Sequence, residues 1–208
     1  MTVLVVDDDE AIRRSLVMLA EAGGHEAVAF ADAETLLRGA RLDEAGCVVT
    51  DVKMPGIGGL ELLRILTGRA VGLPVIVITG HGDVATAVGA LKAGAADFIE
   101  KPFDGRAFLA AIDKALARRS QTKARSREAE ALRARRARLT EREAEVMDMI
   151  AAGLSNAETA ARLGISVRTV ENHRARVLDK MDARGLSELV RLAVRLEELR
   201  EAQAVQET

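Results

Sequence analysis

Four short apolar runs in the first half of the chain each end at or beside a carboxylate, hydroxyl or ammonium group. The runs cover residues 3–6, 47–50, 75–78 and 97–100. They predict β-strands, and the segments between them carry apolar residues at helical spacing. Strands that alternate with helices in one sheet lie parallel, so their carboxyl ends share one edge. In an open α/β sheet, that edge is where ligands bind.

The residues expected at this edge are Asp7, Asp8, Asp51, Thr79 and Lys101. Crowded carboxylates repel one another unless a cation offsets the repulsion. Hard oxygen ligands without an accompanying His or Cys suit Mg²⁺ rather than Zn²⁺. One carboxylate can also act as a nucleophile that forms an acyl phosphate, with a fixed positive charge on the phosphoryl oxygens. The sequence therefore predicts a site for a divalent cation and a phosphoryl group.

The first 117 residues predict one doubly wound α/β domain. A fifth strand is expected at 26–30, and five helices accompany the five strands. Asp32 and Asp83 are expected to cap the helices that follow them, while Asp9 faces solvent or the start of the first helix. The fold class is thus a five-stranded parallel sheet of flavodoxin-like order 2-1-3-4-5, joined through a helical linker to an all-α domain.

The second half of the chain is helical in pattern. Thr140 with Glu143, and Ser155 with Glu158, form two capping boxes, each before an apolar helical pattern. A short helix at 156–163, a turn with Gly164, and a longer helix capped by Ser166 give the pattern of a helix-turn-helix. A fourth helix is expected from about Ser187, followed by a loose polar tail from about residue 200.

The core-facing and outward-facing residues of the longer helix follow from its periodicity. The residues expected to face the core are Val167, Val170, Val177, Leu178 and Met181. The polar residues between them lie on other faces and are available to a partner.

Composition limits the classes of function. In 208 residues there is neither Trp nor Tyr, which argues against nucleic-acid binding by aromatic stacking. The lone Cys47 excludes a disulfide framework and reads as a small buried hydrophobe. No apolar run approaches the roughly 18 residues of a membrane span, and the chain enters a strand at once, so we expect a soluble cytoplasmic protein with no membrane partner.

The net charge of −2 conceals a basic segment. Residues 118–138 carry nine Lys or Arg against two Glu, while the flanking parts of the chain are acidic overall. This segment is rich in helix formers and reads as a helical linker, either simply solvated or contacting phosphates or a dimer partner. The predicted domains are 1–117, the linker 118–138, the DNA-binding domain 139–198 and the tail 199–208.

Residues 1–117 resemble the CheY-like receiver domain of two-component response regulators. The matching motifs are Asp7-Asp8, Asp51 within Thr50-Asp51-Val52-Lys53-Met54-Pro55-Gly56, Thr79-Gly80 and Lys101-Pro102-Phe103. The resemblance implies that Asp51 is the phosphoacceptor and that Mg²⁺ is held by Asp8, Asp51 and the backbone carbonyl of Lys53. Asp7 would help indirectly, and Thr79 and Lys101 would contact the phosphoryl group. It also implies a cis peptide between Lys101 and Pro102.

Residues 139–196 resemble the LuxR-type helix-turn-helix, so the whole chain looks like a response regulator of the NarL/FixJ class. The resemblance rests on residues 139–143, 153–156, 165–174 and 180–181. In this geometry the second helix enters the major groove, where Asn pairs with adenine and Glu accepts from cytosine. We expect Glu171 and Asn172 to read bases. The other expected DNA contacts are Arg168, Thr169, Arg174, Arg176 and Lys180.

The mechanism expected from this resemblance begins with a sensor histidine kinase that phosphorylates Asp51. Thr79 and the loop at 80–83 then move toward the phosphoryl group, and Phe98 turns inward. This biases the helix at 84–93 and the fifth strand toward a homodimer, with Val88 and Lys92 in the interface. The dimer binds double-stranded DNA and regulates transcription, as an activator in our interpretation, with RNA polymerase as a further candidate partner.

Two alternatives belong to other classes of function. An aspartyl-phosphate phosphohydrolase also needs acidic residues at strand ends, although the nucleophile motif expected after its first strand is absent. An interaction protein whose receiver is never phosphorylated is the second. Turnover of a small phosphate ester would favour the first alternative, and mass spectrometry after phosphodonor treatment separates the second.

Overall fold

The computed structural model describes residues 1–69, 72–80 and 84–206 of the chain. They form two compact units, Met1–Lys123 and Ala124–Thr208. The boundary falls within helix α5 (Gly105–Ala137), which is helical throughout. The residues predicted as a linker are therefore divided between the two units. The predicted cap Asp83 and most of its loop lie outside the described residues.

The first unit is built on a five-stranded parallel sheet of order β2-β1-β3-β4-β5, which confirms the predicted fold class. The strands are β1 (Val3–Val6), β2 (Ala27–Phe30), β3 (Cys47–Asp51), β4 (Val75–Thr79) and β5 (Asp97–Glu100). The helices between them are α1 (Glu10–Ala22), α2 (Ala33–Gly39), α3 (Gly59–Gly68) and α4 (Val84–Lys92). The inner strands carry Val and Ile on both faces because helices cover both sides.

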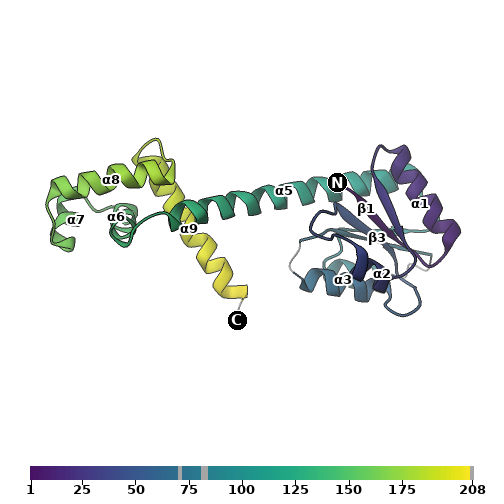
Figure 1. The fold of residues 1–208 in the computed structure, drawn as a ribbon. Coiled ribbons are helices and arrows are strands. Elements are labelled where there is room, and N and C mark those ends of the chain that lie inside the picture. Colours follow the sequence, from purple (N-terminus) through teal and green to yellow (C-terminus); the bar gives the residue numbers. More distant parts are fainter. Residues whose placement is uncertain (70–71, 81–83, 207–208) are drawn as a thin grey trace. The chain divides into compact units, whose positions relative to one another are not determined.

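Helices cover both faces of the sheet (Figure 1), and an apolar layer lies on each face. Leu36 of α2 and Leu62 of α3 pack on one face, together with Ala90 of α4. Leu16 of α1 and Phe108 of α5 pack on the other. Cys47 is fully buried in the second layer, as predicted, and burial raises the pKa of its thiol to about 12. The layers hold the strands firmly, so the strand ends are fixed in relation to one another.

Side-chain caps set where the first helices begin. Asp9 precedes α1, and its carboxylate accepts hydrogen bonds from the amides of Ala11 and Ile12. Asp32 caps α2 in the same way through the amide of Thr35. Both caps satisfy amides that lack a partner at a helix start. Asp9 therefore faces the start of α1, which is one of the two positions predicted for it.

The second unit contains α6 (Glu141–Ala151), α7 (Asn156–Leu163), α8 (Val167–Met181) and α9 (Leu186–Gln206). Both predicted capping boxes are present, at Thr140 with Glu143 and at Ser155 with Glu158. Gly164 ends α7 in the left-handed conformation (φ 66°), which a residue with a Cβ adopts only at a cost. The helix-turn-helix predicted from the sequence is thus formed by α7 and α8.

The core of the second unit confirms most of the predicted α8 pattern. Val170, Val177 and Met181 are fully buried, and Leu178 packs against them. The prediction for Val167 is wrong, since its side chain is 43% exposed. Val167 is the first residue of α8, and a helical side chain leans toward the helix N-terminus, which here carries it past the core.

Both ends of the second unit extend beyond the predicted helical domain. Leu132, in the segment predicted as a linker, is buried in the same core as Leu196 of α9. The tail predicted to be loose continues α9 to Gln206 instead. Its residues are mostly Glu, Ala, Arg and Gln, which favour helix even where they do not pack. None of the described helices is long and apolar enough to cross a membrane.

Arg119 attaches the middle of α5 to the first unit. Its side chain is buried, and the guanidinium donates hydrogen bonds to the carbonyl oxygens of Leu42, Asp43 and Ala45 at 3.3, 3.0 and 3.2 Å. Burial lowers the pKa of Arg119, and the charge of Asp43 partly offsets that effect. These carbonyls belong to the loop between α2 and β3, so this loop and α5 are held together.

We expect Arg119→Met to destabilise the first unit by about 2 kcal/mol, because the buried carbonyl groups of Leu42 and Ala45, and the partly buried one of Asp43, lose a charged donor. Arg118→Met is the matched control, since Arg118 is its exposed neighbour. Thermal unfolding of the full chain, with hydrogen exchange to assign the transition, measures both. Equal behaviour of the two variants would show that the Arg119 hydrogen bonds contribute nothing.

Candidate phosphorylation site and DNA-binding surface

The carboxyl edge of the sheet brings together three of the four charged residues predicted there, Asp7, Asp51 and Lys101. Lys101 follows β5, and its Nζ lies 2.8 Å from Oδ1 of Asp51 and 3.2 Å from Oδ2 of Asp7. Asp51 ends β3, and Asp7 follows β1. One ammonium thus bridges two carboxylates from neighbouring strands. The three groups meet because parallel strands present their carboxyl ends at one edge.

Burial sets the electrostatics of this bridge. The Asp7 side chain is 2% exposed, and this burial raises the pKa of its carboxyl, although an amide hydrogen bond from Asp9 and the charge of Lys101 oppose the rise. Burial also acts to lower the pKa of Lys101, but its hydrogen bond to Asp51 and the charge of Asp7 outweigh that effect and raise it. The pKa of Asp7 is raised because desolvation outweighs its hydrogen bonds and the charge of Lys101. The pKa of Lys101 is raised because its contacts with Asp51 and Asp7 outweigh desolvation. Lys101 therefore stays protonated and positively charged at the carboxyl edge of the sheet.

Local hydrogen bonds fix the Asp51 carboxylate in place. Its Oδ2 accepts a hydrogen bond of 2.7 Å from the amide of Lys53, which turns the chain directly after β3. Thr79 is buried at the end of β4, and its carbonyl accepts from the amide of Lys101 at 2.7 Å. The peptide between Lys101 and Pro102 is cis, as the resemblance implied. Asp8, the residue after Asp7, is exposed.

Gly59, the first residue of α3, is a residue of the site that the sequence did not single out. A Cβ added at this position would lie 2.0 Å from the carbonyl oxygen of Asp51. The amide of Gly59 also donates to the carbonyl of Val52 at 3.0 Å. Only glycine permits this close approach, which packs the start of α3 directly on the strand end that carries Asp51.

The donors at this edge fit a hard divalent ion in their chemistry. Among the residues that the structure describes, no three His, Cys, Asp or Glu side chains gather closely enough to hold a metal by themselves. Mg²⁺ does not need three, because it commonly uses one or two carboxylates and keeps several waters. Asp8, Asp51 and the carbonyl of Lys53 supply such a set, and Lys101 already shows that the Asp51 carboxylate accommodates a cation.

The predicted switch and interface residues lie on the same side of the first unit. Phe98 of β5 is partly buried and packs against the core layer that includes α4. On α4 itself, Val84, Val88 and Leu91 are 81%, 43% and 53% exposed, and Lys92 is exposed beside them. An apolar stripe on a helix is normally buried, so these side chains are available to a partner.

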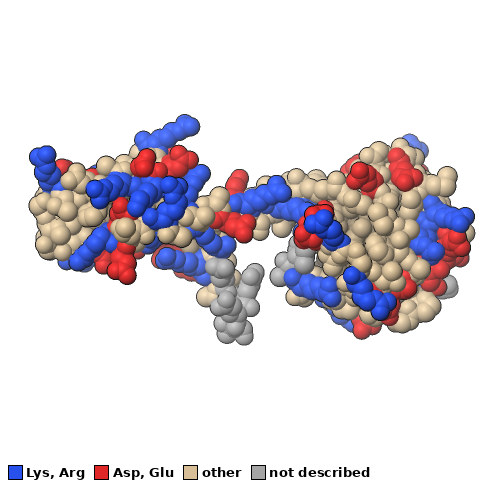
Figure 2. Space-filling model, in the orientation of Figure 1, with Lys and Arg blue, Asp and Glu red and all other residues tan. Residues whose placement is uncertain are grey.

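Four predicted DNA contacts share one exposed face of α8. Arg168, Glu171, Asn172 and Arg176 are all exposed, and their spacing of three and four residues places them on one side of the helix. Figure 2 shows Lys and Arg side chains gathered on the unit that contains α8. Such a surface suits the phosphates of DNA while leaving Glu171 and Asn172 to contact base edges.

The structure gives the other three predicted DNA contacts partners within the domain. The hydroxyl of Thr169 hydrogen-bonds that of Ser166, and Arg174 donates to the side-chain oxygen of Asn156 at 3.4 Å. Lys180 donates to Oε2 of Glu143 at 2.6 Å, which ties the end of α8 to the start of α6. Periodicity could not reveal these pairs, because each joins a polar residue to another element or to a cap. A partner within the domain does not exclude a phosphate contact, so all three stay predictions.

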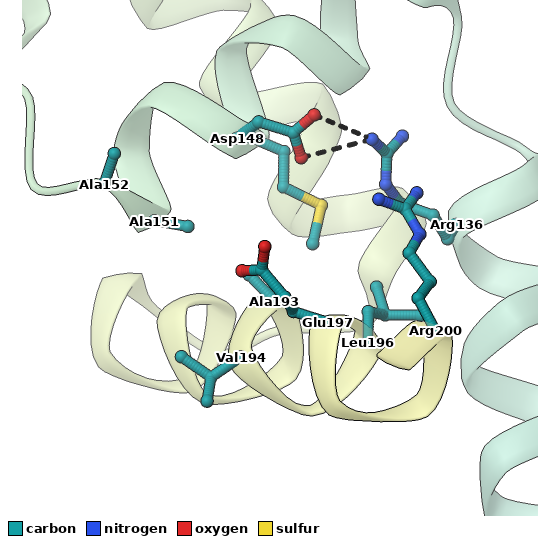
Figure 3. Close-up of a pocket in the computed structure, with 10 residues that line it drawn as sticks. Arg136, Asp148, Ala151, Ala152, Ala193, Val194, Leu196, Glu197 and Arg200 are labelled. Carbon is teal, nitrogen blue, oxygen red and sulfur yellow. Dashed lines mark hydrogen bonds and ion pairs between the residues drawn. The ribbon is translucent and has the colours of Figure 1, made fainter. Parts of the chain in front are cut away.

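A pocket of about 370 Å³ lies in the second unit among residues of α5, α6 and α9 (Figure 3). Arg136 donates to both carboxylate oxygens of Asp148 at 3.2 and 3.1 Å, and joins the end of α5 to α6. Glu197 and Arg200 of α9 reach the same space. No residue of α8 lines this pocket, so it is separate from the surface predicted to contact DNA.

Comparison with known proteins gives the family. The model of the response regulator receiver domain matches residues 3–113, and that of bacterial regulatory proteins of the luxR family matches residues 137–193. The transcriptional regulatory protein FixJ of Azorhizobium caulinodans is 48% identical over 200 residues, which cover 93% of this chain and 92% of the relative. The chain belongs to the response regulators of the NarL/FixJ class.

Other relatives of this response regulator agree. The C4-dicarboxylate transport transcriptional regulatory protein DctR of Rhodobacter capsulatus is 46% identical and covers 92% of this chain and 98% of its own. The solved structure of the response regulator StyR has a TM-score of 0.86 at 38% identity, covering 93% of this chain and 98% of that one. Full-length FixJ from B. japonicum has a TM-score of 0.56 at 42% identity, covering 95% and 97%.

Membership fixes the coarse function of this response regulator. It is a FixJ-like transcription regulator with a receiver and a DNA-binding domain, and not an enzyme, so the phosphohydrolase alternative is set aside. A receiver domain implies a histidine kinase as phosphodonor, and the luxR-type domain implies DNA binding. Receiver domains generally bind Mg²⁺ at the phosphorylation site.

Proposed function

We propose that this response regulator is a phosphorylation-dependent transcription activator whose phosphoacceptor is Asp51. The observation that carries the proposal is the bridge of Lys101 between Asp51 and Asp7 at the carboxyl edge of the sheet. It places a nucleophilic carboxylate, a second acid and a fixed positive charge in one place. That combination is what phosphoryl transfer to a carboxylate requires.

In the proposed reaction, a carboxylate oxygen of Asp51 attacks the phosphorus of a phosphohistidine on the kinase. The bond between nitrogen and phosphorus breaks, and the departing imidazole takes up a proton. Asp8, Asp51 and the carbonyl of Lys53 would hold Mg²⁺, which when bound neutralises charge on the phosphoryl oxygens. Lys101 gives up part of its contact with Asp51 and follows the new phosphoryl oxygens. Thr79 donates a hydrogen bond to them.

The change in charge connects this site to α4. An acyl phosphate carries about −1.5 to −2 charges in place of the single negative charge of the carboxylate, by analogy with other phosphorylated side chains. Thr79 ends the strand beside β5, so its movement toward the phosphoryl group opens space for Phe98 to turn inward. The exposed stripe of Val84, Val88 and Leu91, with Lys92 beside it, is then the surface on which a second receiver pairs. A dimer doubles the phosphate contacts and matches two half-sites on DNA.

The test of this function uses the full chain and acetyl phosphate with Mg²⁺. We expect intact-mass spectrometry to show one added phosphoryl group, analytical ultracentrifugation to show a dimer, and selection from random DNA to recover a two-fold symmetric site. Transcription in vitro with RNA polymerase then separates activation from repression. A chain that takes up no phosphoryl group under these conditions would instead support a receiver that acts without phosphorylation.

We expect Asn172→Ala to change base preference, with discrimination at one position falling by about 1–3 kcal/mol, because an adenine loses its bidentate partner. Glu171→Ala should do the same at a neighbouring position. Arg168→Ala is the matched comparison on the same exposed face, and it should weaken binding to all sequences alike. Affinities for a panel of single-base variants of the selected site measure all three. If Asn172→Ala weakened the binding of all DNA sequences equally, Asn172 would not be a residue that reads bases.

A further inference from the structure

Arg13 of α1 reaches back to the acidic loop that precedes its own helix. Its Nη1 donates hydrogen bonds to the carbonyl oxygen of Asp7 at 2.6 Å and to that of Asp8 at 3.3 Å. The same loop is held at its other end, because the Asp9 amide donates to Oδ1 of Asp7 at 2.9 Å and Asp9 caps α1. The guanidinium therefore fixes two successive peptide groups beside the phosphorylation site.

We propose that Arg13 is a positioning residue that orients Asp8 for Mg²⁺, and this rests on the function proposed above. Peptide orientation sets the direction of the Cα–Cβ bond, so fixing the carbonyl of Asp8 also fixes where its carboxylate can reach. Asp8 is exposed and no hydrogen bond of its carboxylate is seen among the described residues. Its order therefore depends on its backbone. A planar guanidinium suits this task because it presents several donors in a rigid arrangement.

Arg14, the next residue, shows that this contact is particular to Arg13. Its guanidinium forms an ion pair with Glu10 one turn earlier on α1, and both side chains are largely exposed, at 76% and 65%. Exposed pairs of this kind contribute little. The two arginines have the same chemistry and adjacent positions, and they differ in whether they touch the acidic loop. Arg14 is therefore a control for changes in net charge and in helix propensity.

Charge and positioning predict opposite effects on the affinity for Mg²⁺. Arg13 brings a positive charge close to the acidic edge, so its removal would tighten the binding of a cation if charge alone mattered. If Arg13 orients the loop, its removal would weaken binding, because groups that orient metal ligands typically contribute 10- to 100-fold. The sign of the change therefore separates the two roles.

The experiment titrates Mg²⁺ into the unphosphorylated full chain by isothermal calorimetry. We expect Arg13→Ala to raise the dissociation constant about tenfold, with Arg14→Ala equal to the wild type. Arg13→Lys keeps the charge but loses the guanidinium Nη1, the single nitrogen that donates both hydrogen bonds, and should lie near Arg13→Ala. Hydrogen exchange at residues 8–11 should accelerate in the two Arg13 variants only. Unchanged or tighter binding by Arg13→Ala, with its fold intact by circular dichroism, would overturn the proposal.

The proposed function can fail separately. If the wild-type chain binds no Mg²⁺ and accepts no phosphoryl group, both proposals fall. If the wild type and Arg14→Ala bind Mg²⁺ and become phosphorylated while Arg13→Ala has the same affinity, only the role of Arg13 is wrong. Should Arg13→Ala not fold, Arg13→Lys decides by the same titration, since wild-type affinity there would overturn the proposal.

Discussion

Asp51→Asn is expected to abolish both phosphorylation by acetyl phosphate and the gain in DNA affinity that follows it. A carboxamide is not a usable nucleophile toward phosphorus, whereas Asn has nearly the shape of Asp, and its single oxygen still accepts one of the two hydrogen bonds that Asp51 takes on different oxygens from Lys53 and Lys101. The fold should therefore survive the loss of chemistry. Intact-mass spectrometry and DNA binding, each with and without phosphodonor, measure the effect.

Asp9→Asn is the matched control for that experiment. Asp9 lies in the same acidic stretch, but its carboxylate caps α1, and Asn caps a helix about as well. Phosphorylation of this variant should be close to that of the wild type. Undiminished labelling of Asp51→Asn would remove Asp51 from the proposed role, and loss of labelling in Asp9→Asn would show that acidity of the whole stretch matters instead.

The sequence predicted that Asp7, Asp51 and Lys101 meet because each is marked by a local signal, while their roles in phosphorylation stay predictions. Each polar residue of the edge stands directly after an apolar strand, so the topology of a parallel sheet brings Asp7, Asp51 and Lys101 together. The two capping boxes are equally local, with spacing of three residues. Both signals can be recognised in a single sequence, because neither the residue that follows a strand nor a capping box depends on which distant residues pack nearby.

The sequence could not predict contacts between residues that lie far apart in the chain. Arg119 bonds a loop more than seventy residues earlier in the chain, and Lys180 bonds Glu143 on another helix. Both read as exposed basic residues on the basis of their neighbours alone. The prediction that Val167 faces the core was wrong for a related reason. Helical periodicity indicates which side of a helix faces the core, but it does not indicate at which residue of the helix the core begins. Position along an element is set by tertiary packing.

The pair of Glu143 and Lys180 is expected to be the main electrostatic contribution to the stability of the second unit. The Glu143 side chain is 3% exposed, and it accepts from Lys180 at 2.6 Å and from the amide of Thr140 at 2.8 Å. Glu143→Gln keeps an acceptor for Thr140 but leaves the Lys180 ammonium without its counter-charge. We expect a loss of about 2 kcal/mol, below the range for fully buried pairs, because the Lys180 side chain is 28% exposed and water replaces part of the lost contact.

The dependence on pH gives this prediction a second test. The hydrogen bond from Lys180, aided by that from Thr140, lowers the pKa of Glu143 from 4.5 to about 2. A lowered pKa in the folded state stabilises the fold above 4.5, and this contribution is lost as the pH falls from 4.5 toward 2. Thermal unfolding followed by circular dichroism, with hydrogen exchange across α6 to α8 to assign the transition, should show that Glu143→Gln converges with the wild type at low pH.

Glu158→Gln is the control, because Glu158 forms the other capping box with Ser155 and is not bonded to a lysine. It should cost well under half as much at neutral pH, since only hydrogen bonds to a cap are weakened. Equal losses from the two variants would mean that the capping boxes, and not the ion pair, stabilise the unit. In that case the ion pair would contribute little, and Lys180 would exchange Glu143 for a DNA phosphate at little cost in stability.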